Sequence, residues 1–426
     1  MLPRTLSTLC LLAVECAAQS ELPPDVVQVA RIRQLMSRRL EHAPNYTCTE
    51  TIQRSEKHPD AKAFRILDTL RLNVAFADGK EIFSWPGAKQ FENRNLGDMV
   101  GTGLTSSGEF LSYARGVFLG RSTVIRFAGN ETLRGRAAAK YDYRISSFQS
   151  GFTVRSHNAE GPAGMKGSFW VDAGTLDILR LDVDAEEIPE YVPIAASHEE
   201  IDYGRVRLAA SDVVIPEGVG LTLIDRDGLQ RRNRVEFTAC REYHSESAIS
   251  FDPAGPMFGT NPAALQETAL PAGLTLSLEL DESINEGTTS EGDLIAAHLT
   301  RDAVWKKKVL VPKGTTVKGR LRRLEKYAQP RPHYVVGFEF SEMEFEGKRA
   351  SFTCLLSKVG GLAPATSLVT SRQITRSSVT AAGLETQTVT SIQEILPGEV
   401  PGVGTFVIEG SRLRLEKGLR MEWRTE

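Results

Sequence analysis

Histidine is scarce in this chain, and it lacks the motifs of several common catalytic sites. The 426 residues include seven histidines, and no two of them have the spacing of a helical zinc pair. No Gly-x-Ser-x-Gly elbow occurs, and Gly101, Gly103 and Gly108 have the wrong spacing for a dinucleotide-binding loop. We therefore expect a protein that is not an enzyme and has no metal and no cofactor. An unrecognised hydrolase is the remote alternative.

A large charge of one sign and a long apolar run are also missing. Lysine and arginine number 51 against 54 aspartates and glutamates, a net charge of −3, which excludes a globally basic nucleic-acid binder. No run of about 18 apolar residues follows the N-terminus, so we expect no helical membrane protein. The apolar share of 41% and the charged share of 25% are typical of globular chains, and this length allows two or three domains.

The N-terminus has the pattern of an export signal. Arg4 precedes an apolar stretch from Leu6 to Val14 that is too short to span a bilayer, and small residues precede Gln19. The sequence predicts a signal peptide over residues 1–18, with a buried N-terminal helix as the alternative.

Three cysteines remain once residues 1–18 are set aside. Cys48 and Cys240 lie in segments rich in β-branched or aromatic residues, at the first and last predicted strands of an N-terminal domain. An oxidising compartment would allow these two to form a disulfide. The alternative is three buried free thiols, and Cys354 is expected to be a small core residue in either case.

One helix is predicted at residues 25–42. Its apolar residues recur near a period of 3.6, and they are Val26, Val29, Ile32, Leu35, Met36 and Leu40. The other positions include Arg31, Arg33, Arg38 and Arg39. We interpret these arginines as the solvated face of a helix packed on a sheet, with contact to anionic lipid as the alternative.

From Tyr46 to Tyr243 the pattern is mostly β. Alternating segments such as Lys140–Ile145 are separated by turn signals such as Asp225–Gly228. A helical insertion is predicted over Glu109–Arg115. One helix followed by a long antiparallel meander predicts a curved sheet wrapped over helices.

This order of elements, with the segment Trp170–Leu181, resembles the LolA/LolB-like half-barrels, over about residues 22–245. That family includes periplasmic carriers of lipoproteins. The resemblance implies the periplasm or cell envelope of a bacterium, and a lipid, lipoprotein or other apolar ligand held between sheet and helices. A helix that sits off the sheet would leave a cavity of a few hundred Å³. The candidate lining residues are Phe64, Ile66, Leu70, Phe83, Trp85, Phe169, Trp170 and Leu181.

A Pro/Gly-rich linker is predicted at 246–268, followed by a second domain at 269–426. The succession of Leu270–Gly273, Gly292–Leu299 and Val309–Leu321 resembles the periplasmic β-barrel of TrbI-type proteins. The sequence thus predicts a mainly β chain with few helices: a helix plus curved antiparallel sheet, then a second, smaller antiparallel β-barrel. A flexible Thr/Ser/Gly-rich loop is expected at 360–404, and residues 405–424 are expected to pair back into the barrel.

One local feature is a concentration of basic residues between Arg301 and Lys326. On the strand from Val317, alternate positions place lysine and arginine on one face. Contact with an anion, a lipid headgroup or an acidic partner is one interpretation, and a solvated sheet edge is the other. The candidate residues are Lys306, Lys307, Lys308, Lys318, Arg320, Arg322 and Arg323.

These observations favour a non-catalytic envelope protein that binds a lipid, a lipoprotein or another apolar ligand. Peripheral membrane contact is compatible with this interpretation, and no nucleic acid is expected. The alternative is a structural or assembly component that docks other envelope proteins through the C-terminal barrel. The predicted linker also leads us to expect that the two domains fold separately.

Overall fold

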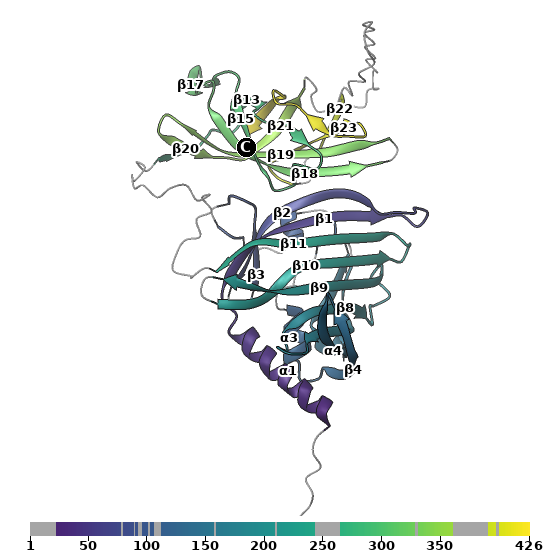
Figure 1. Ribbon diagram of the computed structural model, residues 1–426. Coiled ribbons are helices and arrows are strands. Elements are labelled where there is room, and N and C mark those ends of the chain that lie inside the picture. Colours follow the sequence, from purple (N-terminus) through teal and green to yellow (C-terminus); the bar gives the residue numbers. More distant parts are fainter. Residues whose placement is uncertain are drawn as a thin grey trace, which may run out of the picture.

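The computed structural model describes residues 23–77, 80–88, 90–92, 96–100, 103–105, 112–156, 159–208, 211–242, 265–328, 331–360, 391–397 and 400–426. The predicted signal peptide and residues 246–264 of the predicted linker lie outside this part. The described chain is mainly β with few helices and forms two large sheets, which confirms the predicted fold class (Figure 1). No helix in these ranges is long and apolar enough to cross a membrane.

The first sheet has eleven strands in the order β3-β2-β1-β11-β10-β9-β8-β7-β5-β4, with β6 paired to β7. Its strands are β1 (Tyr46–Lys57), β2 (Arg65–Ala77), β3 (Lys80–Ser84), β4 (Val124–Leu133), β5 (Arg136–Ile145), β6 (Phe152–Ser156), β7 (Ala159–Asp172), β8 (Ile178–Glu186), β9 (Ile194–Leu208), β10 (Ser211–Asp225) and β11 (Gln230–Glu242). Every pairing within it is antiparallel, and β1 pairs with both β2 and β11. The first hairpin is therefore joined to the last strand of the meander.

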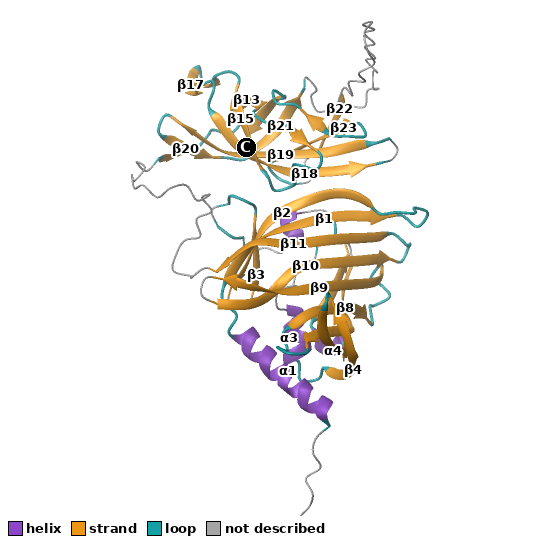
Figure 2. Cartoon of the chain, viewed as in Figure 1, coloured by secondary structure: helices purple, strands orange, loops and turns teal. Residues whose placement is uncertain are grey.

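In the part of the chain that the structure describes, four helices accompany this sheet: α1 (Pro24–Glu41), α2 (Leu96–Val100), α3 (Ser112–Leu119) and α4 (Ser147–Ser150). Helix α1 begins one residue before the predicted 25–42, because Pro23 occupies the N-cap and Pro24 the first turn. Its buried residues Ile32, Met36 and Leu40 join the core formed by the concave face of the sheet. Figure 2 shows α1 and α3 close together at one end of the curved sheet. The predicted helix at 109–115 is described only from Ser112.

A disulfide joins the first strand of this sheet to its last. Cys48 on β1 is bonded to Cys240 on β11, with their Cα atoms 4.1 Å apart, which confirms the predicted pair. The bond coincides with a β-bulge between Thr47 and Thr49 in the β1–β11 pairing. Cys354 is buried and free, as expected of a small core residue. The covalent link reinforces the pairing that joins the hairpin to the meander.

The second large sheet has ten strands. They are β12 (Gln266–Thr268), β13 (Thr275–Leu280), β15 (Leu294–Leu299), β18 (Thr316–Tyr327), β19 (His333–Phe345), β20 (Lys348–Ser351), β21 (Cys354–Val359), β22 (Ser391–Leu396), β23 (Val403–Glu409) and β25 (Arg420–Thr425). Two small antiparallel pairs flank it, β14 (Ile284–Asn285) with β24 (Arg414–Leu415), and β16 (Ala303–Trp305) with β17 (Lys308–Val311). Gly404 on β23 lies against side chains of β21 and β25, so the sheet curls round one core.

The late strands join this sheet as predicted: β25 pairs with β13 and β21, and β23 pairs with β19. The predicted flexible loop at 360–404 is wrong at its C-terminal end, where β22 pairs with β23. A bulge between Ile392 and Glu394 breaks the alternation, yet Ile392 and Ile395 both pack on the core. The predicted linker likewise ends too late, since β12 pairs in parallel with β20. Residues 361–390 lie outside the described chain.

The two sheets meet through β-type hydrogen bonds as well as side chains. The Glu291 backbone N–H donates to the Thr69 carbonyl (2.8 Å), and the Arg71 N–H donates to the Glu291 carbonyl (2.7 Å). The Arg71 guanidinium also pairs with Asp293 at 2.7 Å. Contacts therefore do cross between the two parts, with β18 next to β2 (Figure 1). Separate folding of the two domains stays a prediction.

Beneath these bonds lies a cluster of buried charges. Arg54 on β1 donates two hydrogen bonds to Asp68 on β2, at 2.6 and 2.7 Å. The Glu291 carboxylate lies 3.6 Å from Arg54 and accepts a hydrogen bond from the Leu324 N–H. Glu325 pairs with Arg323 at 3.0 Å. Three carboxylates thus share two guanidiniums in the described chain, and burial followed by the Asp68 charge raises the pKa of Glu291 to about 8.

Gly292 provides a test of how closely the two parts fit. Its φ is +97°, and an added Cβ would lie 2.1 Å from the Arg71 carbonyl oxygen and 2.9 Å from the Trp85 ring. Gly292→Ala should lower the free energy of unfolding by about 1–3 kcal/mol through overpacking, in addition to backbone strain. Gly287→Ala is the matched control, since Gly287 has φ +89° and no atom within 4 Å of its Cβ position. The free energies of unfolding are measured by urea denaturation. An equal loss in Gly292→Ala and Gly287→Ala would contradict a close fit between the two parts at Gly292.

The raised pKa of Glu291 gives a pH-dependent stability. A carboxyl whose pKa is higher in the folded state than its ordinary 4.5 stabilises the fold most fully below that value. This contribution is lost as the pH rises through about 8, where the buried group must ionise. Wild-type melting temperature should therefore fall between pH 6 and 9 more steeply than that of Glu291→Gln, which stays neutral. Parallel melting curves for the two proteins would be inconsistent with a proton held on Glu291.

Candidate ligand-binding cavity

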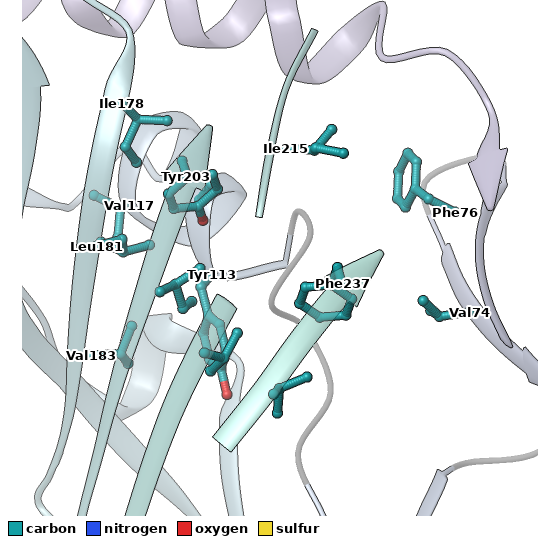
Figure 3. Close-up of a cluster of buried hydrophobic side chains, with 14 of the residues drawn as sticks. Val74, Phe76, Tyr113, Val117, Ile178, Leu181, Val183, Tyr203, Ile215 and Phe237 are labelled. Carbon is teal, nitrogen blue, oxygen red and sulfur yellow. The ribbon is translucent and has the colours of Figure 1, made fainter. Parts of the chain in front are cut away.

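A cavity of about 420 Å³ lies between the C-terminal half of α1 and the concave face of β8, β9 and β10. Its apolar and aromatic lining includes Met36, Leu40, Ala43, Pro44, Tyr46, Ala114, Ile178, Tyr203, Val213, Val214 and Ile215. Figure 3 shows Ile178, Tyr203 and Ile215 on neighbouring strands below α1. The volume is within the range of about 300–1,000 Å³ for small-molecule sites.

Strand alternation explains why this wall is apolar. Ile201 and Tyr203 are two residues apart on β9 and are both buried, whereas Arg205 beyond them is 44% exposed at the cavity edge. On β10 the buried Ile215 is paired with Gly204 of β9, so no side chain opposes it there. The cavity is apolar within and charged at its edge.

Charged side chains form that edge. Arg38, Arg39, Arg205 and Asp212 line the cavity together with His42, the C-cap of α1. The guanidiniums of Arg39 and Arg205 each donate to Asp177, both at 2.5 Å. Burial opposes ionisation of Asp177, but the hydrogen bonds from these two arginines outweigh it, and its pKa is lowered. The Asp177 carboxylate thus holds both arginines in place.

A second cavity, of about 320 Å³, lies toward the opposite ends of the same strands. Its lining includes Glu199 of β9 and Leu221 and Leu223 of β10. The Tyr113 hydroxyl of α3 donates to the buried Glu199 carboxylate at 3.0 Å. Polar and apolar groups alternate around this space, so it is a less favourable site for an apolar ligand than the first cavity.

A third cavity, of about 290 Å³, borders the charge cluster between the two sheets and is lined by Arg54, Asp68, Arg323 and Glu325, among others. These four side chains already pair with one another. In the described ranges, no group of three or more histidine, cysteine, aspartate or glutamate side chains is placed to hold a metal ion. The apolar first cavity is therefore the strongest candidate for a binding site.

The predicted lining residues do not gather at this cavity, and none of the eight lines any of the three cavities. Leu70, Phe83, Phe169 and Leu181 are buried in the core beside it. Trp170 packs on the opposite face of the sheet with Ala138 and Leu179. Ligand contact by the predicted lining residues stays a prediction.

The remaining three have different surroundings. Phe64 lies under the Arg232 guanidinium, 3.9 Å from the ring centre. Ile66 is 50% exposed. Trp85 faces the second sheet, with the Arg322 guanidinium 4.8 Å from its ring.

The basic residues predicted on β18, here called the basic stripe, are Lys318, Arg320, Arg322 and Arg323. Their side chains pair mostly with other groups of the protein. Lys318 pairs with Glu342 and Glu344. Arg320 donates to the Gly292 carbonyl, and burial lowers its pKa to about 10.

Two more of its arginines are also engaged. Arg322 donates to Glu339 at 2.6 Å and to the Met99 carbonyl at 3.3 Å, and Arg323 pairs with Glu325. This part of the stripe contacts the protein itself. Lys306, Lys307 and Lys308 are exposed at the β16–β17 turn, and anion contact there stays a prediction.

Sequence reasoning missed the residues that do form the cavity. The sequence favours a solvated helix face for Arg38 and Arg39, with contact to anionic lipid as the alternative, but it does not place them in the last turn of the helix at a cavity beside Tyr46. Tyr203 and Ile215 lie in segments that were predicted as strands. Strand alternation indicates which residues share a face with Tyr203 and with Ile215. It would identify them as cavity residues only if the concave face of the sheet were already known.

Three comparisons relate this chain to known proteins. A scan of protein-family models and a search of curated proteins found no match. One similar solved structure is a putative outer membrane lipoprotein-sorting protein domain from Vibrio parahaemolyticus, 11% identical, covering 52% of this chain and 95% of that one, with a TM-score of 0.27.

Two further structures are similar at the same level. A DUF1329 family protein from Desulfovibrio piger is 11% identical over 54% of this chain and 97% of that one, with a TM-score of 0.27. A LolA superfamily protein from Nitrosomonas europaea is 8% identical over 50% of this chain and 94% of that one, with a TM-score of 0.24. We draw no functional conclusion from likenesses at these identities and TM-scores.

The disulfide should matter to the cavity as well as to the fold. Cys48 lies two residues beyond the cavity residue Tyr46 and on the same buried face of β1. Replacing both Cys48 and Cys240 by alanine should lower the free energy of unfolding by about 2–5 kcal/mol. The measurement is urea denaturation, with Cys354→Ala as a cysteine control outside the disulfide. A loss no larger than that of the control would contradict the structural role of the bond.

Proposed function

We propose that the first sheet and α1 form a non-catalytic binding module for a lipid or the acyl chain of a lipoprotein. The observation that carries the proposal is the apolar cavity of about 420 Å³ between α1 and the concave sheet. Its wall combines aliphatic side chains with Tyr46 and Tyr203, and its polar groups stand at the edge. This division of apolar interior and polar mouth suits an amphiphile.

The proposed setting is the periplasm or cell envelope of a bacterium. The predicted signal peptide supports export, and the Cys48–Cys240 disulfide is compatible with an oxidising compartment. Within such an envelope the protein would hold or carry its ligand, and would touch a membrane only peripherally.

A second candidate function is docking of another envelope protein through the C-terminal β-barrel part of the chain. It is favoured by the β16–β17 hairpin, where Val304 and Val309 are cross-strand partners and are 53% and 56% exposed. Lys306 and Lys307 form its turn, Lys308 begins β17, and all three are exposed. A partner with an apolar patch and acidic side chains would fit this hairpin.

Displacement of a fluorescent fatty acid from the full chain tests the binding function. Affinity should rise with the chain length of the competitor by about 0.8 kcal/mol per buried methylene, roughly fourfold in Kd. Ala43→Trp should weaken binding at least tenfold, because a partly buried cavity residue gains a large side chain. The matched control is Ala61→Trp, at a position with similar burial in the β1–β2 connection.

Two results would argue against a lipid-binding function. One is the lack of saturable displacement at micromolar protein, and the other is an affinity that does not change with chain length. Either result would shift preference to the docking function of the C-terminal part.

A further inference from the structure

The mouth of the first cavity carries more positive than negative charge. Arg38, Arg39 and Arg205 line it, whereas Asp177 is shared between Arg39 and Arg205. Asp212, the other carboxylate at this edge, pairs with Arg207. The carboxylates therefore leave uncompensated positive charge at the opening of an apolar space.

Arg38 is exposed, as Arg205 is, but of the three arginines only Arg38 makes no ion pair or hydrogen bond through its guanidinium to a described residue. It stands in the last turn of α1, where its side chain lines the cavity and its carbonyl is contacted by the His42 ring at 2.9 Å. The end of a helix carries partial negative charge, which repels an anion. Attraction at this mouth must therefore come from the guanidiniums themselves.

Arg39 has a donor that the described protein leaves unused. Its Nη2 donates to Asp177, but its Nη1 is buried and has no hydrogen-bond partner in the described chain. A buried donor without an acceptor is costly, and most such groups in folded proteins are paired. Because this nitrogen has almost no accessible surface, an acceptor on a ligand in the cavity would reach it only after the guanidinium turned toward the cavity.

We propose that this mouth recognises one anionic head, a carboxylate or a phosphate ester, of an amphiphile whose acyl chain occupies the cavity. The proposal rests on the proposed lipid-binding function and names the chemical class of its ligand. Guanidiniums form short, often bidentate hydrogen bonds with both of these oxyanions. Asp177 fixes two of the three arginines before the ligand arrives, so less side-chain ordering is required on binding.

A series of competitors that differ only in their heads tests the proposal on the full chain. A twelve-carbon fatty acid should displace the fluorescent probe at least tenfold better than the alcohol of the same length. The alkyltrimethylammonium of that length should compete less well than the alcohol. The advantage of the acid should shrink as salt is raised, because the guanidinium of Arg38 is exposed to screening.

Two variants separate a role in head recognition from a role in packing. The double variant Arg38→Gln with Arg39→Gln should bind the fatty acid at least tenfold more weakly and bind the alcohol with unchanged affinity. Lysine at both positions should restore part of the preference. Arg31→Gln is the matched control, since Arg31 is exposed on the same helix but does not line the cavity. Equal weakening of acid and alcohol would mean that the arginines only support the fold, and it would overturn the proposal.

The source of the anion is tested with inorganic phosphate alone. If millimolar phosphate does not displace the probe, the ligand is an amphiphile. If phosphate binds the wild type and this binding is lost in the double glutamine variant, the site is assigned to a free anion. Equal affinity for acid and alcohol would overturn head recognition but leave the binding function standing. If no chain of any head binds, the binding function fails, and head recognition fails with it.

Discussion

The pairing of β1 with β11 is the constraint on which the first part of the molecule depends. It joins the N-terminal hairpin to the far end of a meander that begins more than a hundred residues earlier, and the Cys48–Cys240 disulfide secures it. The same pairing brings Pro44 and Tyr46 to the wall formed by β10. Since α1 leads directly into β1, the position of this strand also sets where the helix crosses the concave face. The cavity is a consequence of that geometry.

The second sheet is attached by a different kind of interaction. Arg54, Asp68 and Glu291 are buried together, and the surrounding β-type hydrogen bonds fix the two edges in register. Buried ion pairs are weak evidence of stability, because desolvation offsets much of their attraction. Their geometric demands are strict, however, and Gly292 leaves no room for a side chain between the parts.

Much of the fold was predictable because it depends on local patterns. The helix at residues 25–42, the strand-rich segment after Tyr46 and the Cys48–Cys240 pair all follow from periodicity and placement. The cavity lining was not predictable in the same way. Alternation separates Phe169 from Trp170 on opposite faces of β7, but it does not say which face is concave. A β-bulge such as the one after Ile392 changes which residues of a strand share a face, and the sequence carries no clear signal of it.

The basic stripe illustrates a second limit. Alternation placed Lys318, Arg320 and Arg322 on one face of β18, but only the tertiary structure shows that Trp85 covers two of these arginines. Two of the arginines at the cavity mouth, Arg38 and Arg39, belong to a helix end for which the sequence pattern favours a solvated face. In both cases the missing information is long-range: a residue's role depends on which distant segment packs against it.

The central claim is that the cavity between α1 and the sheet holds an anionic amphiphile. Native mass spectrometry of the full chain, purified from its own envelope without detergent, tests this claim most directly. The account predicts a stoichiometric adduct that dissociates on activation and is detected as an anionic lipid in negative-ion mode, and the Ala43→Trp protein should lose it. A wild-type protein that carries only water and buffer ions, or a neutral or cationic adduct, would contradict the account.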